Sequence, residues 1–262
     1  MEHPDVRDVL PRERDALLEL LTGLDDRDWG TPTECPAWTV KGVALHVLGD
    51  DLSLLSRQRD AAPPSLPLHG FDEQWVEAAG FLSPDLVIEL LRLTGDWTAR
   101  YYAEVDAGAL GEPVDFFASA GPSPFWQISA REYVERWVHH QQIRRAVGRP
   151  DLGHEFLVPA LDVAVRGLAA HLPDLGAGPG TDIALTVTDV GSWVLHRELA
   201  RWAVCRGAVA EAAAELRLER QLAAPVFSRG LTGSDVGAAF TVTGDAALGF
   251  AALATLARLT GR

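Results

Sequence analysis

The sequence predicts two kinds of structure in succession, an all-helical part followed by a smaller α+β part. Before residue 176, apolar side chains recur at spacings of three and four, which is typical of amphipathic helices. After the breaker cluster at residues 176–180, larger apolar residues alternate with Ala184 and Thr186 over 183–187, which is typical of a strand. We therefore expect one domain over residues 1–175 and a second over residues 181–262.

Local signals place the helices of the first part. Thr39 is a favourable N-cap, and Ser83 followed by Pro84 is another. Ser129 with Glu132 fits the capping-box pattern, and Gly148 ends the helix that this box would open. The helices expected from these signals and from the apolar spacing cover residues 11–24, 40–57, 84–105, 130–147 and 155–172.

Two of these helices carry apolar residues at clear helical spacing. The first carries Leu17, Leu20, Leu21 and Leu24. The third carries Leu86, Leu90, Leu93 and Trp97. Between the third and fourth helices, residues 108–128 show no sustained period, which predicts a long loop able to line a pocket.

The second part has shorter and weaker signals. Strands are expected near residues 181–188, 193–195, 202–204 and 239–243, and Asp245 is placed to cap a terminal helix through Leu259. Residues 208–219 are ambiguous, because their alanine content favours a helix while the alternation after Ala214 suits an edge or half-buried strand.

Composition excludes some functions. The net charge of −14 and the lack of any basic run argue against nucleic acid as a partner. No apolar segment is long enough to span a bilayer and the N-terminal residues are charged, so we expect a cytoplasmic protein without a membrane partner. Cys35 and Cys205 are too few for a disulfide framework, and both are expected to be buried apolar residues.

A metal site is the chemistry that the sequence suggests. Glu135 and His139 are four residues apart on an expected helix, so their side chains lie on one face and can bind one ion. His46 is the best third ligand, because Gly42 and Gly49 flank it and suggest a need for space. From spacing alone, a solvated ion pair between Glu135 and His139 stays an alternative.

A further histidine and two tryptophans lie close to the candidate ligands in sequence, and we expect other positions for them. His140 points about 140° away from Glu135 on a helix, so we expect it at the surface or behind the ligands. Trp38 and Trp137 are expected to pack the bundle, although Trp137 is also close to the ligands in sequence.

Two motifs resemble a known family. The segment Thr33–His46, with its Cys35-Pro36 and Trp38-Thr39 pairs, is similar to the segment that opens the second helix in the mycothiol-dependent maleylpyruvate isomerase family. The segment Glu135–His139 resembles the fourth-helix pattern of the same family. The resemblance implies a DinB-like four-helix bundle over residues 1–175, followed by a sterol-carrier-like α+β domain over residues 181–262.

The resemblance also implies a function. Family members bind a divalent metal, usually zinc, through residues that correspond to His46, Glu135 and His139. The metal would hold mycothiol, a small-molecule thiol, for isomerisation or S-transfer on a small electrophilic substrate. Gln142 and Trp137 are the candidate cofactor contacts, and Gln142 stands where relatives often carry Asp, which leaves the exact reaction open.

Other functions remain as alternatives. A non-catalytic protein that binds a metal or an apolar ligand, of the stress, regulatory or lipid-carrier type, would suit the same bundle and the aromatic loop. Arg197, Arg201 and Arg229 are candidates to meet an anionic substrate, with plain surface charge as the other interpretation of each.

Overall fold

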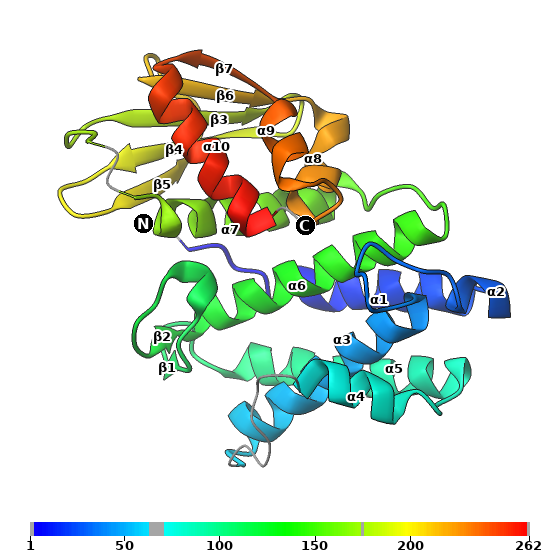
Figure 1. The fold of residues 1–262 in the computed structure, drawn as a ribbon. Coiled ribbons are helices and arrows are strands. Elements are labelled where there is room, and N and C mark those ends of the chain that lie inside the picture. Colours follow the sequence, from blue (N-terminus) through cyan, green and yellow to red (C-terminus); the bar gives the residue numbers. More distant parts are fainter. Residues whose placement is uncertain (1–2, 63–70, 174–175, 261–262) are drawn as a thin grey trace. The chain divides into compact units, whose positions relative to one another are not determined.

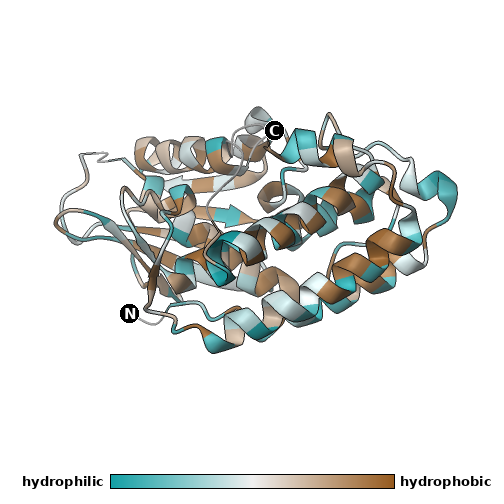
Figure 2. Cartoon of the chain, turned by 90° about the horizontal axis from the view of Figure 1, so that it is seen from below, coloured by the Kyte–Doolittle hydropathy of each residue, from teal (hydrophilic) through white to brown (hydrophobic). Residues whose placement is uncertain are grey.

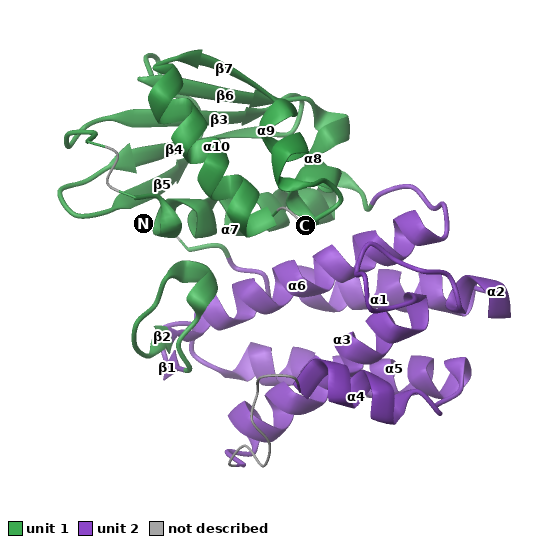
Figure 3. Cartoon of the chain, viewed as in Figure 1, with its two compact units in different colours: residues 1–4, 112–123, 152–262 green, residues 5–111, 124–151 purple. Residues whose placement is uncertain are grey.

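The computed structural model describes residues 3–62, 71–173 and 176–260. It forms two compact units, coloured separately in Figure 3. We call residues 5–111 and 124–151 the helical unit, and residues 1–4, 112–123 and 152–262 the sheet unit. The helix-rich first part and the α+β second part confirm the predicted fold class.

Four long helices and two shorter ones make up most of the described part of the helical unit (Figure 1). Their bounds are α1 Val9–Thr22, α2 Asp26–Trp29, α3 Val40–Leu54, α4 Phe71–Ala79, α5 Pro84–Glu104 and α6 Phe125–Ala146. A π-helical turn, Leu55–Arg59, continues α3, and the short strands β1 (Leu110–Gly111) and β2 (Ser123–Pro124) precede α6.

Two predicted helix starts are confirmed and one is wrong. The Thr39 side chain accepts from the Gly42 N–H, and the Ser83 side chain accepts from the Leu86 N–H. The helix α6 begins at Phe125, so Ser129 lies inside it and donates to the carbonyl of Trp126. Backbone carbonyls of the preceding loop accept from the first N–H groups of α6, so no capping side chain is required there.

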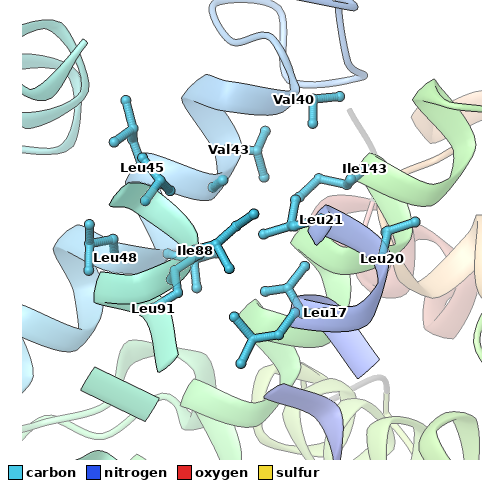
Figure 4. Packing of buried hydrophobic residues seen from close by; sticks show 14 of the residues in the cluster. Leu17, Leu20, Leu21, Val40, Val43, Leu45, Leu48, Ile88, Leu91 and Ile143 are labelled. Carbon is cyan, nitrogen blue, oxygen red and sulfur yellow. The ribbon is translucent and has the colours of Figure 1, made fainter. Parts of the chain in front are cut away.

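A hydrophobic core joins α1, α3, α5 and α6 (Figure 4). Each helix shows both hydrophobic and hydrophilic residues along its length (Figure 2), as amphipathic helices do. Val87, Ile88 and Leu91 are buried apolar residues of α5. The periodic residues Leu86 and Leu93 are instead about two-fifths exposed, so they mark the helix without forming its core face.

The sheet unit places five strands of the described residues in the order β5-β4-β3-β6-β7 (Figure 1). Pairing is antiparallel except between β3 and β6, which are parallel. The strands are β3 Asp182–Val187, β4 Gly191–Arg197, β5 Trp202–Arg206, β6 Ala214–Leu218 and β7 Phe240–Gly244. The ambiguous segment thus contains an interior strand, because β6 lies between β3 and β7.

Helices cover one face of this sheet (Figure 1). They are α7 His154–His171, α8 Arg220–Phe227, α9 Gly233–Ala238 and α10 Ala246–Thr260. The helix α7 packs on β4 and β5, and α10 packs on β6 and β7. Because α7 contacts the sheet, it groups with the sheet unit, whereas the sequence placed the domain boundary after it; that boundary stays a prediction.

No helix in the described ranges is both long and apolar enough to cross a membrane. Neither α8 nor α9 was expected, because both helices are short and contain Pro225 or Gly residues that usually interrupt helices.

Candidate metal centre

Two helices bring the three predicted ligands together. His46 lies on α3, and Glu135 and His139 lie on α6. Each offers one ligand atom, and these atoms all lie within 4.8 Å of one another. His139 Nε2 is 3.6 Å from Glu135 Oε2, and the two imidazole rings meet edge to face with centroids 4.6 Å apart.

This donor set suits a divalent transition metal. Two imidazoles and one carboxylate are a ligand combination that zinc uses when one coordination position is left for water or substrate. His46 and His139 are 7% and 4% exposed, so neither needs to leave bulk water to bind an ion. The three residues therefore fit the metal that the sequence predicts, although their role as ligands stays a prediction.

Gln142 orients one of the ligands. Its Oε1 lies 2.9 Å from His139 Nδ1, and an amide oxygen can only accept, so Nδ1 carries the proton of that bond. The other ring nitrogen, Nε2, then faces Glu135 and is available to a metal. Gln142 is buried and lies behind the predicted ligand, and its role as a cofactor contact stays a prediction.

Cys35 joins the same network, which sequence reasoning missed. Its Sγ donates to Gln142 Oε1 at 3.2 Å, and the thiol is half-buried. The expectation of a plain apolar residue is therefore wrong for Cys35, and it is also wrong for Cys205, which is exposed on β5.

The pKa of His139 reflects these neighbours. Burial alone would lower it, but hydrogen bonds with Cys35 and Glu135, and the negative charge of Glu135, raise the pKa of His139 to about 10. In the metal-free protein this imidazole is therefore cationic at neutral pH, with a proton on Nε2 as well as on Nδ1. A metal must displace that proton in order to bind at Nε2.

Two more carboxylates lie beside His46. Asp50 Oδ2 is 3.4 Å from His46 Nε2, and Asp72 Oδ1 is 3.8 Å from His46 Nδ1. Burial, followed by repulsion from Glu132, holds the pKa of Asp50 well above its usual range. Burial, followed by the neighbouring Glu73, raises the pKa of Asp72.

These carboxylates define a second possible ligand set. His46, Asp50 and Asp72 also offer ligand atoms within 4.8 Å of one another. Asp50 lies four residues after His46, the same spacing that identified Glu135 and His139, so the sequence held a signal for it. Asp72 lies on α4 and gives no local signal, since only the fold brings it to His46.

Two tryptophans form a wall of the site. The Trp38 ring stacks on the His46 ring with centroids 4.7 Å apart, and the Trp75 N–H donates to the Leu45 carbonyl at 2.6 Å. A Cβ at Gly42 would lie 2.9 Å from Trp38 Cβ, and one at Gly49 would lie 2.5 Å from Trp75 Cδ1. The glycines beside His46 therefore make room for indoles. The expectation that they make room for a ligand is wrong.

The opposite side of α6 holds a buried ion network. Asp51 on α3 accepts from Arg136 at 2.5 Å, from Arg14 at 2.7 Å and 3.1 Å, and from the Thr94 hydroxyl at 2.7 Å. Burial alone would raise the pKa of Asp51, but Arg14 and Arg136 hold it below its usual range. This network ties the two ligand-bearing helices together from behind.

His140 and Trp137 belong to the same side. His140 Nδ1 pairs with Glu13 Oε1 at 2.7 Å, and both side chains are fully buried. The expectation of a surface or ligand-supporting position for His140 is therefore wrong. Trp137 is also fully buried, so its ring packs the bundle as expected, and its role as a cofactor contact stays a prediction.

The arginines of the sheet unit have other local contacts. Arg201 pairs with Glu198 at 2.7 Å at the surface, and the Arg197 guanidinium lies 5.8 Å from the centre of the Trp202 ring. Arg229 follows α8 with a positive φ of 59°. None of these observations assigns any of the three to a substrate.

The fold and the site together define a helix-bundle protein with an α+β second part and a His-Glu-His cluster between two bundle helices. The sequence matches the family described as "Mycothiol maleylpyruvate isomerase N-terminal domain" over residues 10–144, which is just over half of the chain. The chain therefore belongs to the mycothiol maleylpyruvate isomerase family.

Solved structures agree with this assignment at the level of the fold. The chain resembles the crystal structure of the mycothiol-dependent maleylpyruvate isomerase, with 14% identity and a TM-score of 0.58, covering 90% of this chain and 91% of that one. A histidine-to-alanine mutant of that enzyme matches over the same shares with 13% identity and the same TM-score. No curated protein matches the sequence.

Proposed function

We propose that this protein is a metal-dependent enzyme that uses mycothiol for isomerisation or S-transfer on a small electrophilic substrate. The observation that carries the proposal is the convergence of His46, Glu135 and His139 from two helices, with their ligand atoms within 4.8 Å of one another. Membership of the family supports the thiol as the cofactor. Zinc is the metal that this donor set favours.

The charge of the site suits a thiol. A divalent ion held by two neutral imidazoles and one carboxylate would retain one positive charge and would favour the deprotonated, nucleophilic form of a coordinating thiol. The protein's own residues would then have defined tasks. His46, Glu135 and His139 bind the ion, and Gln142 keeps the His139 proton on Nδ1.

Other residues would protect the reaction. Trp38 covers one face of His46, and Trp75 is anchored to the carbonyl of Leu45, the residue before His46, so both limit the access of water to that ligand. The Arg136–Asp51 pair holds α3 and α6 in register, which fixes the separation of the ligands before the ion arrives.

The test is metal analysis combined with thiol binding. Purified protein is expected to contain about one zinc per chain after loading, and His46→Ala and Glu135→Ala are expected to lose it. Calorimetry should then detect mycothiol binding to the wild type but not to either variant. His154→Ala and Glu155→Ala remove the same residue types from exposed positions on α7 and serve as controls.

The outcomes separate the competing functions. Wild-type protein that binds no stoichiometric metal, or ligand variants that retain it, would contradict the proposal. Metal binding without any thiol binding would favour the non-catalytic metal-binding alternative. Tight binding of fatty acyl chains by the metal-free protein would favour the lipid-carrier alternative.

A further inference from the structure

Acidic side chains crowd the metal-ligand cluster from three helices. We call Asp50 on α3, Asp72 on α4 and Glu132 on α6 the acidic rim. Asp50 and Asp72 approach the two nitrogens of His46, at 3.4 Å and 3.8 Å. Glu132 lies one turn before Glu135 on the same helix, and its side chain is 13% exposed.

One guanidinium lies within salt-bridge distance of the carboxylates of α6 here. Arg131 Nη1 is 3.0 Å from Glu132 Oε1, and its Nη2 is 3.7 Å from Glu135 Oε1. Burial raises the pKa of Asp50, so the charge of the cluster rests on Asp72, Glu132 and Glu135, three carboxylates set against this guanidinium among the described residues. With neutral imidazoles, as metal binding requires, these three carboxylates exceed the guanidinium by two negative charges. In the metal-free protein the protonated His139 reduces this excess to one.

A bound cation with its thiolate does not reverse the sign of this charge. A divalent ion compensates for the two charges, and a coordinated thiolate then adds one negative charge. The loaded site would therefore carry about one negative charge, within a partly desolvated region where charges act more strongly than in water. A carboxylate on an incoming substrate would be repelled.

A negative site is unfavourable for a dicarboxylate substrate, which would bind better to a positive one. The enzyme named in the related structures acts on maleylpyruvate, which carries two carboxylates. Resting on the function proposed above, we propose that the electrophile accepted by this site bears no carboxylate and is uncharged or cationic. Asp72 and Glu132 are the residues that determine this specificity, since they add charge without belonging to the His46, Glu135 and His139 set.

The charge of the site can be measured without any turnover. Trp38 is half-buried and stacks on His46, so its fluorescence reports ions that enter beside the ligands. In the metal-free protein, caesium is expected to quench this emission more strongly than iodide, with acrylamide as the uncharged reference. Trp38→Phe identifies the part of the signal that comes from the site.

Removing charge from the acidic rim should weaken the preference for caesium over iodide. In the double variant Asp72→Asn, Glu132→Gln, the ratio of iodide to caesium quenching constants is expected to rise at least about twofold, because two negative charges of the acidic rim are gone. Glu77→Gln removes one charge from an exposed position on the same helix as Asp72 and should leave the ratio unchanged. An unchanged ratio in the double variant would overturn the proposed field.

A matched pair of electrophiles tests the substrate class directly. Metal-loaded protein and mycothiol are supplied with 1-chloro-2,4-dinitrobenzene, which is uncharged, or 4-chloro-3,5-dinitrobenzoate, which carries one carboxylate. In each case a C–S bond forms, the C–Cl bond breaks, chloride leaves with the electron pair and the thiol proton passes to the buffer. Rates are divided by the uncatalysed rate of the same thiol.

The expected enhancement is at least about tenfold larger for the uncharged compound, and Asp72→Asn should narrow that gap. Equal or greater enhancement of the benzoate would overturn the inference. If mycothiol binds but neither compound reacts faster, the S-transfer reaction of the proposed function fails, and the quenching ratio alone then decides the charge preference. If mycothiol does not bind at all, the proposed function fails independently of the rim.

Discussion

Two polar clusters lie on neighbouring residues of α6, and they differ in how their charge is compensated. Arg136 and His140 face the buried network, where Asp51 accepts from Arg14 and Arg136, and Glu13 pairs with His140. Two carboxylates there meet two guanidiniums. We call this the anchor cluster, and its charges are balanced by the protein itself.

The ligand cluster of His46, Glu135 and His139 lies one residue away along the same helix, and it is not balanced. Together with the acidic rim, its carboxylates outnumber the nearby guanidinium. Burying unequal charge costs free energy, so a protein tolerates it where a ligand supplies the missing charge. The comparison therefore separates a cluster that stabilises the bundle from the one that we propose receives a cation.

The largest effect should follow from breaking the anchor cluster. Asp51→Asn leaves Arg14 and Arg136 buried without a carboxylate, which typically costs about 3–5 kcal/mol. Urea unfolding of the metal-free protein measures the loss. The matched variant is Asp50→Asn, one residue away in the acidic rim. It should change the free energy of unfolding by less than about 1 kcal/mol. Similar losses in both variants would contradict the distinction.

Adjacent histidines offer the same contrast for metal binding. His139→Ala should lower zinc affinity by more than the ~10–100-fold that loss of a ligand's hydrogen-bond partner costs, because it removes the donor itself. His140→Ala should keep the metal but reduce stability by about 1–3 kcal/mol, since Glu13 loses its buried partner. Zinc titration and urea unfolding of both variants check this, and metal loss in His140→Ala alone would reverse the assignment.

A smaller effect is expected from the residue behind the ligand. Gln142→Leu removes the acceptor for His139 Nδ1, so zinc affinity should fall by about 10–100-fold while the three ligands remain. Gln142→Asp keeps an acceptor and adds a negative charge, so it should bind zinc at least as tightly as the wild type. Unchanged affinity in Gln142→Leu would show that the ring is oriented by other contacts.

Much of the ligand cluster could be predicted from the sequence, because two of its members depend on helical spacing. Glu135 and His139 follow from the i, i+4 rule once α6 is recognised, and the caps Thr39 and Ser83 mark helix starts through local hydrogen bonds. His46 required a second clue, since nothing local pairs α3 with α6. The family motif supplied it.

Long-range packing accounts for what the sequence did not predict. Asp51 and Arg136 are 85 residues apart, and their pairing depends on how the bundle closes. The glycines beside His46 suggested a ligand pocket, yet the space they leave is filled by Trp38 and Trp75. The start of α6 was misplaced because loop carbonyls, and not the Ser129 side chain, accept from its first N–H groups.

The pH dependence of the two clusters should also differ. In the metal-free protein the pKa of His139 is raised to about 10 from its ordinary 6.5, so zinc must displace a proton. Between about pH 7 and about pH 9, zinc affinity should therefore rise up to about tenfold per pH unit from this group. Calorimetry in buffers of different ionisation enthalpy should count about one released proton per zinc. Binding without proton release would show that His139 is not a ligand.

The stability of the metal-free protein should change with the opposite sign. A histidine whose folded pKa is raised adds stability that is fully present below its ordinary pKa of 6.5 and is lost as the pH rises through about 10. Asp51 has a lowered pKa and stays ionised over this whole interval, so the anchor cluster adds no slope there. A falling stability of the metal-free form together with a rising zinc affinity would thus assign both trends to the ligand cluster.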